Sequence, residues 1–175
     1  ERWQAAVCCI QNAGKRAYLL LPQIFRTEAE CFFREQAERL LDLPLDALII
    51  WNLEEPGFFE TLYGERNRRC PAFYFDFQVY GMNRTAQLCL REFGAARLTL
   101  PIEETARELK SLDTAGQEMV VAGRLPMMVS ANCLKKTAAR CDHKPEYMKL
   151  RDRRMMEMPV KTHCTFCYNT IYNAA

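Results

Sequence analysis

The stretch "ALIIWNLEEPGFFETLYGERNRRCPAFYFDF", residues 47–77, decides the fold class. Short apolar runs stand at both of its ends, at 47–52 and 72–77, and the segment 55–64 between them has the spacing of an amphipathic helix. A short run that is apolar throughout is typical of a parallel strand, because such a strand is buried on both faces of its sheet. The stretch therefore predicts a strand, a helix and a second strand parallel to the first.

The same alternation extends along the chain in both directions, as short apolar runs separated by segments with helical spacing. We expect parallel strands near 17–21, 47–51, 72–76, 96–100 and 118–122, each but the last followed by a helix. Roughly four to five such units make about half of an eight-stranded barrel. The predicted fold class is α/β, with a partial (βα) TIM-barrel-like repeat over residues 1–123 and an open parallel sheet as the alternative.

Helix ends are also marked in the sequence. Thr27 followed by Glu30 has the spacing of a capping box, in which a hydroxyl and a carboxylate satisfy the first backbone amides of a helix. Gly64 and Gly94 stand where two of the predicted helices should end.

Composition restricts the classes of protein. The 175 residues are 49% hydrophobic and 26% charged, which suits a globular domain with a core, and no apolar run reaches the roughly 18 residues that a membrane span needs. A net charge of +2 is too small to indicate nucleic-acid binding by itself. The chain begins with Glu1 and shows no basic-then-apolar leader, so we expect a piece of a longer protein. Nine cysteines without a leader favour reduced thiols and a cytoplasmic location over a disulfide framework.

Polar residues follow the predicted strands at the edge where parallel folds gather their chemistry. They are Gln23, Arg26, Asn52, Glu55, Asp76, Gln78, Asn83 and Glu103. Any one of them could be a helix cap or a loop hydrogen-bonding residue, but their common position at one rim makes the group a candidate site.

The segment after Gly123 breaks the alternation and forms a second predicted region, a four-cysteine module over residues 124–175. It holds Cys133, Cys141, Cys164 and Cys167, the last two as a Cys-x-x-Cys pair. Four thiols this close in a reducing compartment indicate a metal site, because thiolates suit zinc and iron–sulfur clusters. The spacing does not choose between these metals, and four unrelated reduced thiols or a redox dithiol at the terminal pair are the alternatives.

The region 124–175 also contains two histidines and a predicted hairpin. His143 and His163 are possible substitute ligands. Residues 147–160 should form a strand or hairpin with Arg153 and Arg154 at the turn, and the methionines there should serve packing.

Six motifs taken together resemble the collagenase-like peptidase family of unassigned catalytic type. They are "LPQIFR", "WNLEE", "DFQVYGMNRTA", "ARLTLPIEE", "PMMVSANCLKKTAARC" and "YMKLRDRRMMEMPVKTHCTFCYNTIYN", and they are spread over nearly the whole chain. The resemblance implies a (βα)-barrel core with an attached cysteine module. This sequence departs from the family pattern at Phe77-Gln78, at Gly81-Met82 and in the length between the cysteine pairs.

By the same resemblance, the four module cysteines would hold a 4Fe–4S cluster, and Asp76, Asn83 and Glu103 would be catalytic residues at the rim. Several bacterial relatives act in oxygen-independent hydroxylation, which implies RNA or a small aromatic molecule as substrate. The family is also named for peptidases and collagenases, which implies a hydrolase instead. The third alternative is a non-catalytic fragment whose cysteines hold a structural zinc.

The residues themselves give the hydrolase little support. The sequence contains no Gly-x-Ser-x-Gly and no His-Glu-x-x-His motif. Cys164 beside His163 is the only sequence-local pair that could supply an activated thiolate.

Overall fold

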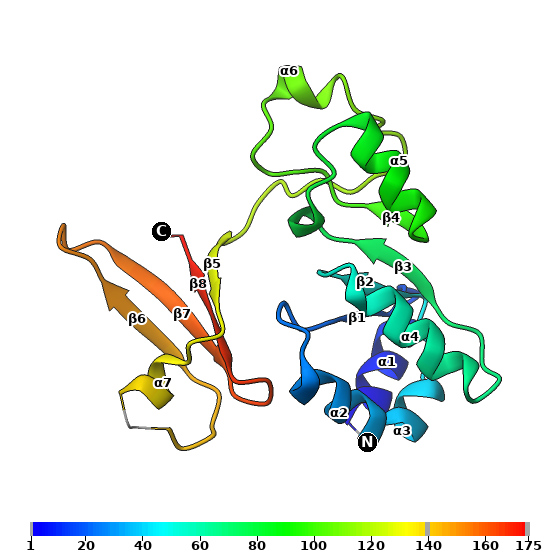
Figure 1. Ribbon diagram of the computed structural model, residues 1–175, viewed down its shortest axis with the longest axis horizontal. Coiled ribbons are helices and arrows are strands. Elements are labelled where there is room, and N and C mark those ends of the chain that lie inside the picture. Colours follow the sequence, from blue (N-terminus) through cyan, green and yellow to red (C-terminus); the bar gives the residue numbers. More distant parts are fainter. Residues whose placement is uncertain (1, 139–140, 174–175) are drawn as a thin grey trace. The chain divides into compact units, whose positions relative to one another are not determined.

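The computed structural model describes residues 2–138 and 141–173 and divides into two compact units (Figure 1). Unit 1 is Glu1–Val120 and unit 2 is Val121–Ala175. Within the described residues, no helix is long and apolar enough to cross a bilayer.

Unit 1 is built on a sheet of four parallel strands whose spatial order, β1-β2-β3-β4, is their order in the sequence. The strands are β1 (Tyr18–Leu20), β2 (Ala47–Ile50), β3 (Ala72–Phe75) and β4 (Ala95–Leu98). Leu48 of β2 pairs with Leu19 of β1 and with Phe73 of β3, so the sheet is in continuous register across its centre. The first four predicted strands and the α/β class are confirmed.

Helices precede, connect and follow the strands of unit 1. They are α1 (Arg2–Asn12), α2 (Thr27–Glu35), α3 (Ala37–Leu41), α4 (Glu54–Gly64), the 3-10 turn η1 (Phe77–Val79), α5 (Arg84–Glu92) and α6 (Ala106–Leu109). Gly64 is the last residue of α4, and Gly94 follows α5 with a φ of 92° that favours glycine, so both helix ends are confirmed.

The core of unit 1 lies between α4 and its neighbouring strands. Phe59 and Leu62 of α4 are fully buried, as are Ile50 of β2 and Phe75 of β3. Phe59 packs edge-on against Phe33 of α2 at 5.1 Å between ring centroids. Each such side chain stabilises the fold by about 1.5–3 kcal/mol relative to an exposed one, which explains why the apolar runs of the sequence located the strands.

Two details of the prediction for unit 1 differ from the structure. The fifth strand, 118–122, is reduced to a single parallel bridge between Thr99 and Glu118. Val121 is 83% exposed and Met119 is 57% exposed, so this apolar run is not the buried strand that was predicted. The helix predicted after the fourth strand is present only as the four-residue α6.

The capping box lies at a different helix from the one expected. The N-cap of α2 is Arg26, which makes no side-chain cap hydrogen bond, so the box expected from Thr27 and Glu30 was wrong. Thr105 and Glu108 form a complete box at α6, where each side chain accepts from the backbone amide of the other. Thr27 is already inside its helix, and its hydroxyl is one residue too late to act as the cap.

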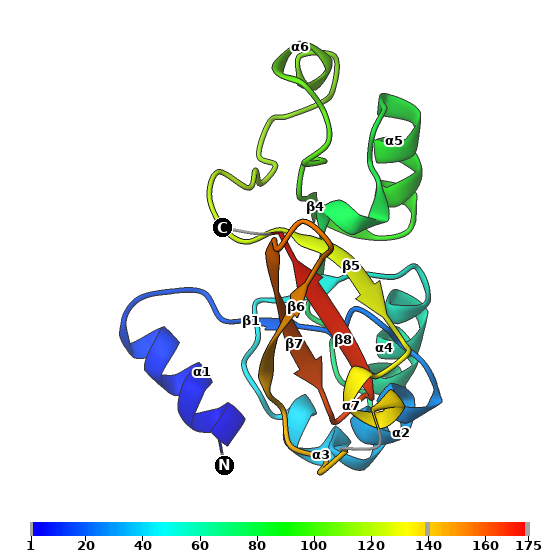
Figure 2. The same ribbon diagram turned by 90° about the vertical axis from the view of Figure 1, so that its left-hand side faces the viewer.

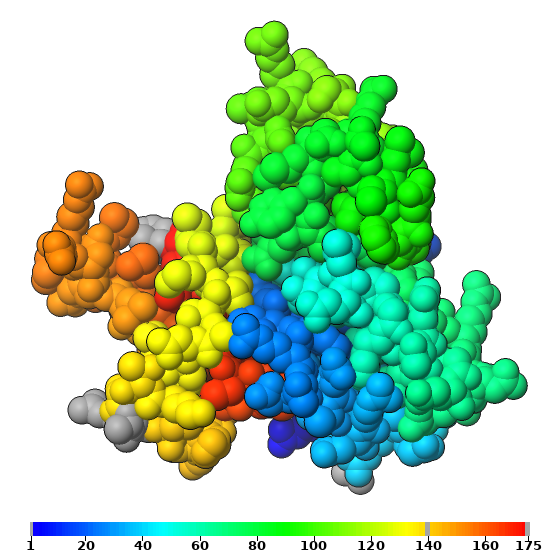
Figure 3. Space-filling view, in the orientation of Figure 1, coloured from blue at the N-terminus to red at the C-terminus, as the bar shows by residue number. Residues whose placement is uncertain are grey.

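Unit 2 is an antiparallel sheet with the order β5-β8-β7-β6. Its elements are β5 (Pro126–Ser130), α7 (Leu134–Thr137), β6 (Tyr147–Arg151), β7 (Glu157–His163) and β8 (Tyr168–Tyr172). The expected hairpin is confirmed as β6–β7, whose tip protrudes from the unit in Figure 3 (orange). The Asp152 carboxylate holds this turn by accepting the backbone amides of Arg154 and Met156, both at 2.8 Å.

Candidate functional site

The register of the antiparallel sheet determines where two of the module cysteines lie. Ser130, the last residue of β5, pairs with Asn169 near the start of β8. Cys133 follows Ser130 in the chain and Cys167 precedes β8, so both lie beyond the same end of the sheet. The Asn169 amide fixes this junction by donating to the Asn132 carbonyl at 2.9 Å.

The segments of the other two cysteines, Cys141 and Cys164, lie at the same end of the antiparallel sheet. Cys164 and Cys167 lie in the turn that joins β7 to β8, where His163 pairs with Tyr168. Tyr147, the first residue of β6, pairs with Lys161 near the end of β7, so the segment that carries Cys141 also enters the sheet here. Figure 2 shows this end of the sheet beside α7.

Two of the other thiols lie near enough to the Cys167 thiol to affect its ionisation. They are Cys133, which has the larger effect, and Cys141. Burial first, and then these two neighbours, raise the pKa of Cys167, while the nearby Lys136 lowers it. Cys133 is only 5% exposed. An anionic thiolate at Cys167 would therefore need a positive partner.

The turn itself has a specific shape. The Phe166 amide donates to the His163 carbonyl at 3.2 Å, and Cys167 adopts a left-handed backbone with a φ of 56°. Cys164 is placed near Cys167 by this turn, although its polar contact in the described part of the chain is with the Thr162 hydroxyl at 3.8 Å.

A buried lysine ties together the segments that carry Cys133 and Cys141. Lys135 of α7 is 5% exposed and forms ion pairs with Asp142 and with Glu146, the latter at 3.3 Å. Its ammonium also donates to the Lys144 carbonyl at 3.0 Å. Because Asp142 follows Cys141 directly, Lys135 holds that cysteine's segment against α7.

Neither histidine of the module is arranged as a ligand. The His163 ring stacks on Tyr168 at 4.3 Å, and its Nε2 lies 3.2 Å from the Thr170 hydroxyl. Burial, with a smaller contribution from Lys161, lowers the pKa of His163 to about 4, so the ring is neutral at physiological pH. His143 is exposed and has a φ of 57°.

As arranged, residues 2–138 and 141–173 contain no group of three or more His, Cys, Asp or Glu side chains that could hold a metal ion. The donor chemistry nevertheless fits a thiophilic metal, because the groups that meet at this end of the sheet are thiols. Asn169 also keeps its Oδ1 buried there without a hydrogen-bond partner in the described residues. The four-cysteine site remains a prediction.

The rim of the parallel sheet carries a second set of candidates. Asp76, directly after β3, caps η1 by accepting the Phe77 amide at 2.7 Å, and burial, with a smaller contribution from Glu118, raises its pKa to about 6. Asn83 caps α5 by accepting the Ala86 amide at 2.8 Å. Glu103 is exposed in the loop after β4.

The three predicted catalytic residues are therefore not joined to one another. Across the described residues, no hydrogen bond or ion pair links Asp76, Asn83 and Glu103. Two of them act as helix caps, and a shared cleft for all three stays a prediction.

Glu55 is the rim residue whose importance the sequence did not single out. It is fully buried, and its carboxylate accepts the Trp51 amide at 2.7 Å, the Asn52 amide at 3.2 Å and the Asn52 side chain at 3.2 Å. Burial raises its pKa to about 7, and these hydrogen bonds oppose the shift. The spacing Asn52-x-x-Glu55 before an apolar helix is the signal that could have identified it.

No protein-family model, no curated protein and no solved structure matches this chain.

Proposed function

We propose that this chain belongs to an enzyme of the collagenase-like peptidase type that binds an iron–sulfur cluster. In this proposal Cys133, Cys141, Cys164 and Cys167 hold a 4Fe–4S cluster, and the enzyme takes part in oxygen-independent hydroxylation of RNA or a small aromatic substrate. The unpaired state of all nine cysteines fits the reducing, cytoplasmic setting that such a cluster requires.

The observation that carries the proposal is the convergence of the four cysteine segments at one end of the antiparallel sheet. Strand register brings the segments of Cys133, Cys141 and the Cys164–Cys167 turn together from separate parts of the chain. Cys133 and Cys141 both contribute to raising the pKa of Cys167.

A bound cluster would supply one-electron redox chemistry. The chain's own residues would prepare its site: Lys135 orders the segment of Cys141, and the left-handed backbone at Cys167 allows the short turn to present a thiol. The neutral His163, engaged with Thr170 and stacked on Tyr168, would shield one side of the turn from water.

We also propose that the four parallel strands are part of a (βα) barrel. Four parallel strands that are spatial neighbours in sequence order follow the order found in a (βα) barrel, whereas a doubly wound sheet reverses direction at a switch point. We propose that Asp76, Asn83 and Glu103, on the side where such barrels bind substrates, contact the substrate.

Structural zinc is the second candidate, because Cys-x-x-Cys in a tight hairpin turn is also how small zinc sites present two thiolates. The peptidase alternative has less support. His163 is engaged with Thr170 and Tyr168 and makes no recorded hydrogen bond with Cys164, so the described structure shows no activated thiol–imidazole pair at this place.

Metal analysis of protein purified without oxygen tests the proposal. We expect a brown protein with visible charge-transfer absorbance and with iron and sulfide in about equal amounts. Cys133→Ser, Cys141→Ser and Cys167→Ser should each lower the iron content strongly. Cys89→Ser, at an exposed thiol of α5, is the matched control and should leave it unchanged.

The remaining outcomes decide between the alternatives. A colourless protein with about one zinc per chain would favour the structural-zinc fragment over the redox enzyme. Metal content that is unaffected by Cys133→Ser and Cys141→Ser would refute a four-thiol site of either kind.

A further inference from the structure

The β6–β7 hairpin concentrates positive charge. Residues 147–161 contain five lysines and arginines and two acidic residues, so this segment has a net charge of +3, whereas the whole chain has only +2. Strand β6 is paired with β7 along its full length, from Tyr147 to Arg151. The charges therefore stand on an ordered two-stranded scaffold.

Strand alternation places the exposed residues of β6 on one face of this hairpin. Tyr147, Lys149 and Arg151 are exposed and alternate with less exposed apolar residues. Two cross-strand contacts agree with this placement. Glu157 of β7 pairs with Lys149 at 2.7 Å and with Arg151 at 2.6 Å, and the Lys161 ammonium lies over the Tyr147 ring, 6.0 Å from its centroid.

Both acidic residues of the segment are already engaged. Arg151 and Lys149 lower the pKa of Glu157 to about 2, so this single carboxylate stays ionised and balances only one of its two cationic partners. The Asp152 carboxylate accepts the Arg154 and Met156 amides within the turn. Most of the positive charge of the hairpin is thus left without a carboxylate.

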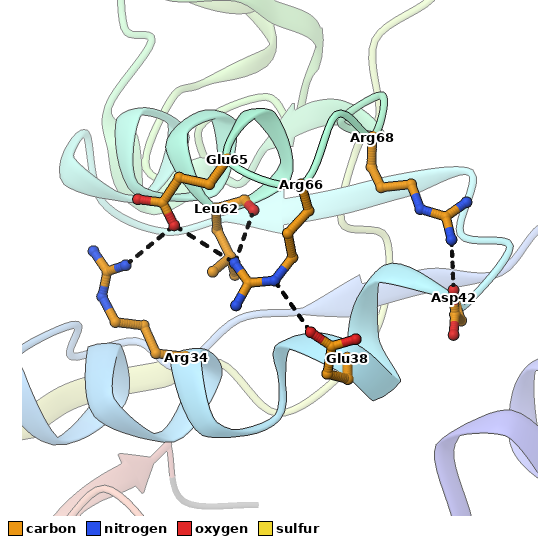
Figure 4. A network of polar contacts seen from close by, with 7 residues as sticks. All are labelled: Arg34, Glu38, Asp42, Leu62, Glu65, Arg66 and Arg68. Carbon is orange, nitrogen blue, oxygen red and sulfur yellow. Dashed lines mark hydrogen bonds and ion pairs between the residues drawn. The ribbon is translucent and has the colours of Figure 1, made fainter.

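The two arginines of the turn show this most clearly. Arg153 and Arg154 are exposed, and neither guanidinium has a hydrogen bond or ion pair within residues 2–138 and 141–173. By contrast, Arg34, Arg66 and Arg68 of unit 1 each meet a carboxylate (Figure 4). Two adjacent free guanidinium groups offer forked donors that match phosphate oxygens.

An aromatic ring lies on the same hairpin. Tyr147 is 74% exposed, and Lys161 is close enough to its ring for a cation–π contact. An exposed tyrosine among cations is the combination that binds single-stranded nucleic acids, since the ring stacks on a base while the cations contact the phosphates.

From these observations we propose that the β6–β7 hairpin binds single-stranded nucleic acid. Arg153, Arg154 and Lys161 would contact phosphates, and the Tyr147 ring would stack on a base. The proposal names a nucleic acid, and not a small aromatic molecule, as a partner of this protein. It uses none of the module cysteines, so it does not rest on the proposed cluster.

A lipid surface is the alternative that the test must exclude. The tip of the hairpin also exposes Met155 and Met156, by 66% and 48%, and anionic lipids attract clustered arginines. The nucleic acid is favoured because the cations and the ring extend from the turn along the strands, and a strand of phosphates and bases offers a partner to each of them.

Fluorescence anisotropy of the whole chain with a labelled oligouridylate of about 12 nucleotides measures the binding. We expect a Kd on the order of 10⁻⁵ M, as in non-specific nucleic-acid binding. With three phosphates contacted, log affinity should fall against log salt with a slope of about −2. Arg153→Gln with Arg154→Gln should weaken binding about tenfold and reduce the slope to about −0.7.

The matched control removes two charges elsewhere. Arg107→Gln with Lys110→Gln, at exposed residues in and after α6, makes the same change in net charge and should leave affinity and slope unchanged. Tyr147→Ala should weaken binding about tenfold, whereas Tyr147→Phe keeps a ring and should bind within about twofold of wild type. Thermal denaturation of each variant separates lost binding from lost structure.

Three results would overturn the proposal. The first is a Kd above about 1 mM for the oligouridylate, and the second is equal weakening by the turn variant and the α6 variant. The third is binding to phosphatidylglycerol vesicles, or to a duplex of the same length, at least as tight as to the single strand.

Discussion

Replacing Glu55 by Gln should change how the stability of the protein depends on pH. The Glu55 carboxyl is fully buried, and its pKa is about 7, whereas the ordinary value is 4.5. The folded state therefore holds its proton up to a higher pH than the unfolded state does. The stabilising contribution is complete below pH 4.5 and is lost as the pH rises through 7.

The magnitude follows from this difference in pKa. At about 1.4 kcal/mol for each pH unit between the two values, the full loss of stability is about 3.5 kcal/mol. Most of this loss of unfolding free energy occurs between about pH 5 and pH 8. It is a large share of the roughly 5–15 kcal/mol by which a typical domain is stable. Glu55→Gln keeps an acceptor oxygen for the Trp51 amide but cannot ionise, so this part of the pH dependence should disappear.

Urea denaturation followed by tryptophan fluorescence, at a series of pH values, measures the effect. Glu54→Gln is the matched control, because Glu54 is the exposed neighbour on the same helix and its substitution should leave the slope unchanged. Asp76, whose pKa is also raised, contributes in the same direction and is removed by Asp76→Asn. The reasoning fails if wild type and Glu55→Gln lose equal free energy of unfolding between about pH 5 and pH 8.

Three further predictions concern the caps and the cysteine module. Asn83→Ala should lower the free energy of unfolding by about 1 kcal/mol, because α5 loses its side-chain cap, and Asn83→Ser should restore most of it in thermal denaturation. Lys135→Met should lower the metal content of anaerobically purified protein, because it releases the segment of Cys141, whereas the exposed Lys149→Met should not. Removal of the metal by a chelator should increase proteolysis within unit 2 before unit 1; equal cleavage of both units would contradict a metal confined to the module.

The sequence predicted most of the parallel sheet because its signal is local. The apolar run 47–50 is largely buried on both faces, and 72–75 buries Phe73 and Phe75 on one face, so short apolar runs identify both as strands. The run 118–122 carries the same composition but is largely exposed, because a strand also needs a covering helix, which composition does not report. The capping box predicted at Thr27 and Glu30 was wrong for a related reason, since a cap depends on the residue at which the helix begins.

For the candidate sites, too, some features follow from the sequence and others only from the packing. The sequence by itself gave the four module cysteines as candidate ligands and predicted the β6–β7 hairpin, because both depend only on residue type and order. Only the tertiary structure decided that the segments of Cys133 and Cys167 lie at one end of the antiparallel sheet, since strand register sets which distant segments become neighbours. It also distinguished Glu55 from Asn83 at the rim: the pKa of a carboxyl depends on burial and on nearby donors, which are properties of the folded packing and not of the residue.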